Sequence, residues 1–118
     1  MIDSPSRGEA LSTAMKDWAS ATREQRILAH YFLFSFFKLS ESAWYQRKVQ
    51  ALDGPQWQGW ETVLLAFYHS DGVKSGWWPH RGNAYSPEFQ AYLARSARPG
   101  AIGSLEQIFS NSLRASDV

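Results

Sequence analysis

The sequence contains no cysteine, and it lacks other signatures of catalytic or membrane proteins as well. Without cysteine there is no disulfide framework, no thiol nucleophile and no cysteine-ligated zinc, although the compartment is left undecided. The densest apolar stretch, residues 27–39, is interrupted by polar residues and is shorter than the roughly 20 residues that span a bilayer. We therefore expect no membrane span.

Charge of one sign is not concentrated anywhere in the chain. Twelve basic residues stand against eleven acidic ones, and no Lys/Arg block could follow a phosphate backbone, so we expect no nucleic-acid partner. Residues 1–8 are polar and lack the apolar run of a secretion signal, which favours a cytoplasmic location.

Local patterns for metal, phosphate or nucleophile chemistry are also missing. The sequence has three histidines: His30, His69 and His80. None is paired with another histidine at helical spacing, so we predict no metal site. There is no glycine-rich phosphate loop, and the serines resemble ordinary helix-face residues. We predict no catalytic residue and no cofactor, and an enzyme is the less favoured class.

What the chain does have is apolar and aromatic content. It is 118 residues long, with 44% hydrophobic and 15% aromatic residues. That length is typical of one domain, and the composition is too apolar for a disordered chain. We predict a single helical domain over residues 1–118, in which residues 1–8 and about 97–118 are peripheral or flexible.

Helical periodicity and capping signals divide the chain into helices. We predict helices at about residues 9–19, 23–51, 53–69, 73–80 and 86–95. Thr22 with Gln25 forms a capping box, and Asp53 and Ser86 are N-caps followed closely by proline. A second capping box at Ser104 indicates a short tail helix. The prediction is an all-α fold, an irregular four-helix bundle with a long central helix (about 23–51) and a short C-terminal helix.

The long predicted helix carries an apolar stripe. At about 100° per residue, a single stripe collects these positions: Ile27, Tyr31, Phe34, Tyr45, Val49 and Leu52. This stripe is predicted to pack inward. Phe32 and Phe36 project from the opposite face, so the helix is either central or meets a partner there, and a homodimer through these two residues is one expectation.

Glu41 lies near the middle of the predicted inward stripe, with Tyr45 and Lys48 on the same side. A buried carboxylate needs a cation or hydrogen-bond donors. Two interpretations are open: a perturbed acid lining a pocket with His80 or Arg81, or a structural carboxylate that locks one helix against another. The structural interpretation is favoured.

Two tryptophan-rich segments follow. Trp57, Trp60, Leu64 and Phe67, with Val63 alongside, have the spacing of a buried helix face. Farther along, Trp77 and Trp78 precede the cations His80 and Arg81 and could form one wall of an aromatic pocket. Because adjacent helical residues point about 100° apart, only one of these two tryptophans can point directly into the core. The candidate pocket or buried polar cluster contains Glu41, Tyr45, Lys48, Trp77, Trp78, His80 and Arg81.

The order of these motifs resembles a family of small uncharacterised bacterial helical proteins. The elements E-x-x-W-Y-Q, L-D, W-x-x-W, G-x-x-x-x-W-W and Y-S-P-E-F follow one another between about residues 23 and 93. The resemblance implies a compact helical domain of unknown function that frequently follows membrane-spanning helices, with no catalytic residues to transfer. The chain departs from that pattern because its first forty residues contain no span and Pro79 follows the paired tryptophans.

Two classes of function follow from the sequence. The favoured one is a non-catalytic interaction or ligand-sensing module that self-associates through Phe32 and Phe36. The alternative is a small-molecule-binding protein or small enzyme with an aromatic pocket, in which Glu41 acts with Arg81 or His80. Membrane association enters only through the family resemblance.

Overall fold

The computed structural model describes residues 4–99 of the chain. Over this range the protein is all-α and forms no strand, which confirms the predicted fold class. Its elements, in chain order, are α1 (Ser4–Lys16), η1 (Trp18–Ser20), α2 (Arg23–Lys48), α3 (Gly54–Tyr68), η2 (Val73–Trp77), α4 (Trp78–Arg81), η3 (Gly82–Ala84) and α5 (Pro87–Arg95). The tail helix predicted at Ser104 lies outside the described residues.

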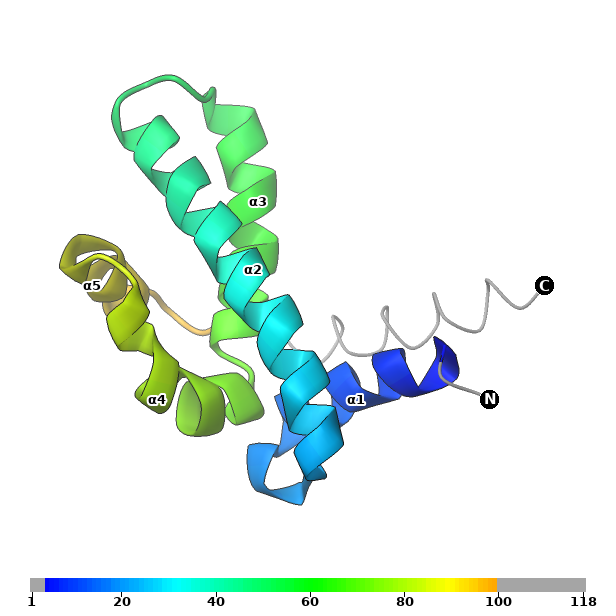
Figure 1. Ribbon diagram of the computed structural model, residues 1–118. Coiled ribbons are helices and arrows are strands. Elements are labelled where there is room, and N and C mark those ends of the chain that lie inside the picture. Colours follow the sequence, from blue (N-terminus) through cyan, green and yellow to red (C-terminus); the bar gives the residue numbers. More distant parts are fainter. Residues whose placement is uncertain (1–3, 100–118) are drawn as a thin grey trace.

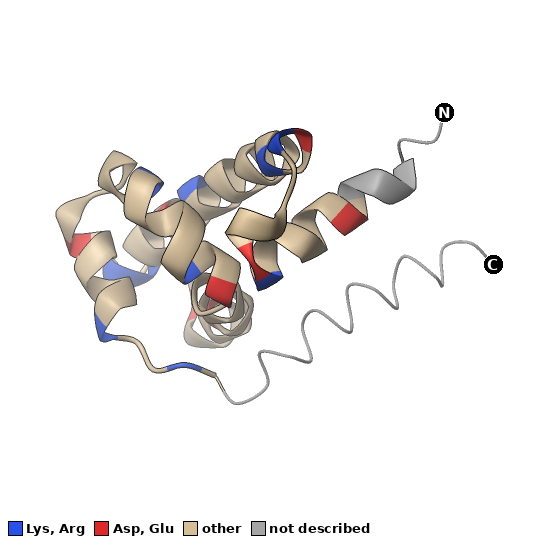
Figure 2. Ribbon diagram, turned by 90° about the horizontal axis from the view of Figure 1, so that it is seen from below, with Lys and Arg blue, Asp and Glu red and all other residues tan. Residues whose placement is uncertain are grey.

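The helices are arranged around a long hairpin (Figure 1). α2 and α3 run antiparallel beside each other, α1 crosses the N-terminal half of α2, and α4 and α5 lie along another side of the hairpin. Basic and acidic residues are distributed over the helices rather than collected on one of them (Figure 2). No described helix is long and apolar enough to cross a membrane.

The three N-caps predicted within the described residues are confirmed. Thr22 Oγ1 accepts from the backbone N–H of Gln25 (3.1 Å), while Gln25 Oε1 accepts from the backbone N–H of Thr22 (2.9 Å). Asp53 and Ser86 accept from the N–H groups three residues later and begin α3 and α5. Each cap satisfies amide groups that a helix start leaves without a partner, so these boundaries are determined locally.

Helix ends differ from the prediction by a few residues. α2 ends at Lys48 rather than near residue 51, because Gln50 adopts a left-handed conformation (φ 64°). The N–H groups of Gln50 and Ala51 then bond to the carbonyls of Arg47 and Gln46, a Schellman motif. α1 spans residues 4–16 rather than 9–19, because Asp17 is extended and caps the separate turn η1.

The predicted inward stripe is wrong for four of its six residues; the other two, Phe34 and Leu52, are half-buried and pack against the core. Tyr31 and Tyr45 are 68% and 59% exposed, and Ile27 and Val49 are exposed as well. The face that is buried consists of Ala29, Leu33, Phe37, Ser40 and Ala43. Three of these five are small, which allows neighbouring helices to approach α2 closely, whereas hydrophobicity alone favoured the bulkier stripe.

The core of α3 is confirmed in part. Trp57, Leu64 and Phe67 are buried, whereas Trp60 and Val63 are exposed. The indole N–H of Trp60 donates to Ser40 Oγ (2.9 Å), so this tryptophan lies at the boundary with its polar atom bonded.

The segment from residue 73 to residue 81 is two elements rather than one helix. A π-helical turn, η2, leads into the short helix α4, in whose first turn Pro79 needs no hydrogen-bond donor. Trp77 is buried and Trp78 is half-buried, as expected from their angular separation. The π turn places Gly76 and Trp77 opposite the start of α2.

Candidate functional site

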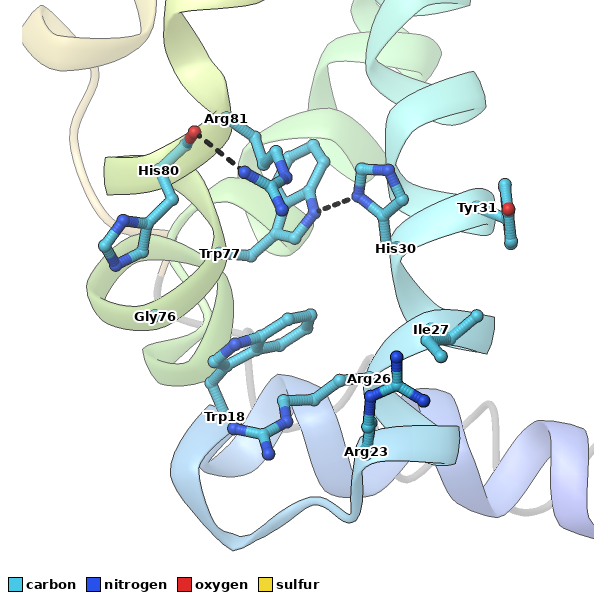
Figure 3. A pocket seen from close by; sticks show the side chains of 10 residues that line it. All are labelled: Trp18, Arg23, Arg26, Ile27, His30, Tyr31, Gly76, Trp77, His80 and Arg81. Carbon is cyan, nitrogen blue, oxygen red and sulfur yellow. Dashed lines mark hydrogen bonds between the residues drawn. The ribbon is translucent and has the colours of Figure 1, made fainter.

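A cleft opens between the N-terminal half of α2, the turn η1 and the η2–α4 segment (Figure 3). Its volume is about 610 Å³, within the range of small-molecule sites. It is lined by Trp18, Arg23, Arg26, Ile27, His30, Tyr31, Gly76, Trp77, His80 and Arg81.

The cleft is lined by cations and by no carboxylate. Arg23 and Arg26 come from successive turns of α2, and Arg81 comes from the end of α4. Within the described part of the chain, the ion pairs use Lys38, Lys48 and Arg98 instead. The guanidinium groups of the cleft therefore have no carboxylate partner among the described residues, and they remain available to an anion.

Trp77 forms the floor of the cleft and fixes the protonation of His30. Trp77 is 1% exposed, and its indole N–H donates to Nδ1 of His30 (3.0 Å). Because an indole can only donate, Nδ1 must be unprotonated, and the neutral imidazole carries its proton on Nε2. Burial, and then the charge of Arg81, lower the pKa of His30. His30 is thus a neutral residue with one N–H donor, held between α2 and η2.

This arrangement predicts that acid destabilises the protein. Below about pH 6.5 His30 becomes protonated in the unfolded chain, whereas in the native protein the lowered pKa disfavours protonation. The free energy of unfolding therefore falls as pH falls. The pKa of His69 is lowered in the same direction, first by burial and then by Lys74 and Arg98. We expect His30→Asn, which keeps an acceptor for Trp77, to reduce the fall between pH 7.5 and pH 5. Urea unfolding of both proteins across this range is the measurement, and parallel curves would show that His30 is not perturbed.

Trp18 forms the wall opposite Trp77, and its position is tightly constrained. A Cβ atom added to Gly76 would lie 2.2 Å from Cβ of Trp18, so only glycine permits this approach. Figure 3 shows the Trp18 indole across the gap from Trp77 and His30, with Arg23 and Arg26 beside it. The cleft therefore has accessible aromatic surface at the half-buried Trp18, while the buried Trp77 closes its floor.

A second hollow adjoins the cleft on the far side of Trp18. It shares Trp18, Arg26, Gly76 and His80 with the cleft, and it adds Lys16, Asp17, Ala19, Asp71 and Ser75. The two carboxylates lie in this hollow rather than in the cleft. The cleft itself is thus the more favourable place for an anion.

Of the residues predicted as a candidate pocket, the cleft collects three: Trp77, His80 and Arg81. Trp78 is packed instead against Tyr85 and Phe37, with ring centroids 5.2 and 5.3 Å apart. Tyr45 is exposed on α2. Lys48 lines another hollow of about 440 Å³ near the C-terminal end of α2 and pairs with Glu88 at 3.8 Å.

Glu41 is not among the residues that line the cleft. Its Oε2 accepts from the backbone N–H of Ser86 (2.6 Å), the N-cap of α5, and its Oε1 lies 3.7 Å from Nζ of Lys38. Lys38 in turn donates to the carbonyl of Ala84 (2.6 Å). The two side chains thus bond α2 to the connection into α5, at Ala84 and Ser86. These contacts agree with the structural interpretation of Glu41.

Sequence reasoning missed the α2 and η1 side of the cleft. Arg23, Arg26 and His30 recur at helical spacing on one face of α2, and this was the one available signal. No sequence signal indicated a role for Trp18, because it lies next to Gly76 and Trp77, which are some 60 positions away in the sequence.

Comparison with models of protein families, with curated proteins and with solved structures finds no match to this chain. The family resemblance of the motifs therefore stays a prediction, and the roles of the residues rest on the geometry of the cleft.

Proposed function

We propose that the protein is a non-catalytic binding module whose cleft between α2, η1 and α4 takes a small anionic ligand. One observation carries the proposal: three arginines line a cleft of about 610 Å³ with no carboxylate in its lining or paired with them among the described residues. Guanidinium groups bind carboxylate or phosphate through paired hydrogen bonds. A non-catalytic role, a cytoplasmic location and the lack of a nucleic-acid partner remain predictions from the sequence.

The neutral His30 supports the same proposal. An imidazole that carries its proton on Nε2 can donate to an anion, and it adds no second positive charge beside Arg81. The cleft thus combines permanent cations with a neutral donor. This combination suits the binding of an anion.

Removing one guanidinium should weaken anion binding. We expect Arg26→Gln to lower the affinity for inorganic phosphate or acetate about tenfold or more, because a hydrogen bond to a charged group contributes about 1.5–3 kcal/mol. Titrations followed by NMR, read at the indole N–H signals of Trp18 and Trp77, suit weak binding. Arg95→Gln is the matched control, since Arg95 is an exposed arginine on α5 outside the cleft. Unchanged signals on titration of the wild-type protein would rule out the proposed function.

We also propose that the outer face of α2 mediates self-association. Phe32 is 43% exposed, and Leu28 and Leu39 are exposed on the same side of the helix. Both rings contact Phe67 within the molecule, with ring centroids 5.7 Å away for Phe32 and 4.8 Å away for Phe36. Because Phe36 is half-buried and Phe32 is exposed, Phe32 is the more accessible member of the predicted pair.

For self-association, we expect sedimentation velocity to show a concentration-dependent dimer for the wild-type protein and a monomer for Phe32→Lys. Tyr45→Lys is the control, because it places the same charge at another exposed position of α2. A wild-type protein that stays monomeric at millimolar concentration would contradict the proposal.

A further inference from the structure

The walls of the cleft are as distinctive as its charges. Trp18 and Trp77 lie on opposite sides of the gap, and Ile27 and Tyr31 add apolar and aromatic surface at the exposed side of α2 (Figure 3). An inorganic anion would use the arginines alone. It would leave the aromatic walls of a cleft of about 610 Å³ without a partner.

Trp18 is held in place before any ligand arrives. Its Cβ lies so close to Gly76 that no larger residue fits there, and the side chain packs against the hydrophobic core. A fixed indole does not have to lose conformational freedom when it binds a planar ring. The floor is fixed in the same way, because Trp77 is buried and bonded to His30.

The cations are placed beside this aromatic surface. Figure 3 shows Arg23 and Arg26 next to the Trp18 indole and Arg81 next to Trp77, with the gap between the two groups. The cleft that would take a planar ring is therefore also lined by three guanidinium groups. Aromatic faces and arginines together select ligands that carry both features.

From this arrangement we infer that the ligand joins a planar aromatic ring to an anionic group, with the ring on the half-buried Trp18 indole, facing His30, and the anionic group on the arginines. The inference rests on the proposed function and names the class of its ligand. A carboxylate and a phosphate ester share the chemistry that the cleft recognises, so the experiment compares both.

Five probes, titrated into the full chain, test the inference by calorimetry or NMR: benzoate, phenyl phosphate, acetate, inorganic phosphate and benzyl alcohol. We expect each ring-bearing anion to bind about tenfold or more tightly than the ion that lacks the ring, and benzyl alcohol to bind more weakly than benzoate. Preference for either aromatic anion supports the inference and identifies the anionic group.

Two variants separate the ring from the charge. Trp18→Leu should abolish the advantage of each aromatic anion over the anion that lacks the ring, whereas Arg26→Gln should weaken the binding of every anion. Arg95→Gln should change neither. Circular dichroism checks that Trp18→Leu folds. If this variant does not fold, the affinities of the wild-type protein for the five probes still test the inference.

The contrary outcomes are distinct. Equal affinity for ring-bearing and ring-free anions would overturn this inference and leave the proposed anion site intact. Benzyl alcohol binding as tightly as benzoate, or no binding of any anion, would overturn the inference together with the proposed function.

Discussion

Replacing Gly72 by alanine should unfold the protein or lower its free energy of unfolding by about 3 kcal/mol or more. A Cβ atom at this position would lie 1.7 Å from the carbonyl oxygen of Ala14, and that oxygen belongs to the backbone of α1. The helical backbone angles of Gly72 suit any residue, so the loss comes from the collision alone. To relieve it, α1 and η2 would have to move apart.

Gly59→Ala is the matched control for Gly72→Ala. Gly59 lies in the interior of α3, and an added Cβ meets nothing within 4 Å. We therefore expect this variant to gain about 1 kcal/mol, which is the helix-propensity difference between glycine and alanine. Thermal unfolding followed by circular dichroism measures both. A Gly72→Ala protein that melts with the wild type would show that α1 does not pack against η2 as described.

Phe37→Ala should produce the second large loss, about 3–5 kcal/mol. Phe37 is 0% exposed and its ring lies within 5.5 Å of the ring centroids of Phe36, Trp77 and Trp78. Truncation removes the buried ring and leaves a cavity between α2 and the segment that forms the floor of the cleft. Because that floor would lose support, we also expect weaker anion binding.

Two truncations on the same helix provide the scale for Phe37→Ala. Phe32→Ala removes an equal ring that is 43% exposed, and we expect a loss of about 1 kcal/mol. Tyr45→Ala belongs to the stripe that hydrophobicity predicted to be inward, and we expect a change within about 0.5 kcal/mol because its ring is 59% exposed. Chemical denaturation gives the three values. A Tyr45→Ala loss as large as that of Phe37→Ala would reverse the assignment of the buried face.

Much of the helical framework was predictable because its signals are local. An amide group at a helix start is satisfied by a side chain three residues away. Thr22, Asp53 and Ser86 therefore each indicate the start of a helix from the local sequence alone. The absence of strand alternation and the helical spacing of apolar residues were sufficient for the all-α class. Helix ends were less accurate, since the left-handed Gln50 is not a residue that typically ends a helix.

The buried face of α2 could not be chosen from the sequence. Between residues 27 and 37, large apolar residues lie on more than one face of the helix, so the hydrophobic pattern has no single direction. Only the packing of α1 and α3 decides between the bulky stripe containing Tyr31 and the smaller one containing Ala29. Ser40 shows the same limit: it is fully buried, yet its hydroxyl bonds to Phe36 and Trp60, a pairing across two helices that periodicity cannot foresee.

By itself, then, the sequence determined the all-α class, the starts of α2, α3 and α5, the lack of cysteine chemistry and the presence of an aromatic, cationic segment around Trp77. The tertiary structure decided that this segment faces Arg23, Arg26 and Trp18, and that Glu41 serves the start of α5 instead of the cleft. The physical reason is the distance along the chain over which each kind of interaction acts. Caps and periodicity act within one or two helical turns, whereas the cleft depends on α1, α2 and η2 approaching each other at glycine and alanine positions tens of residues apart.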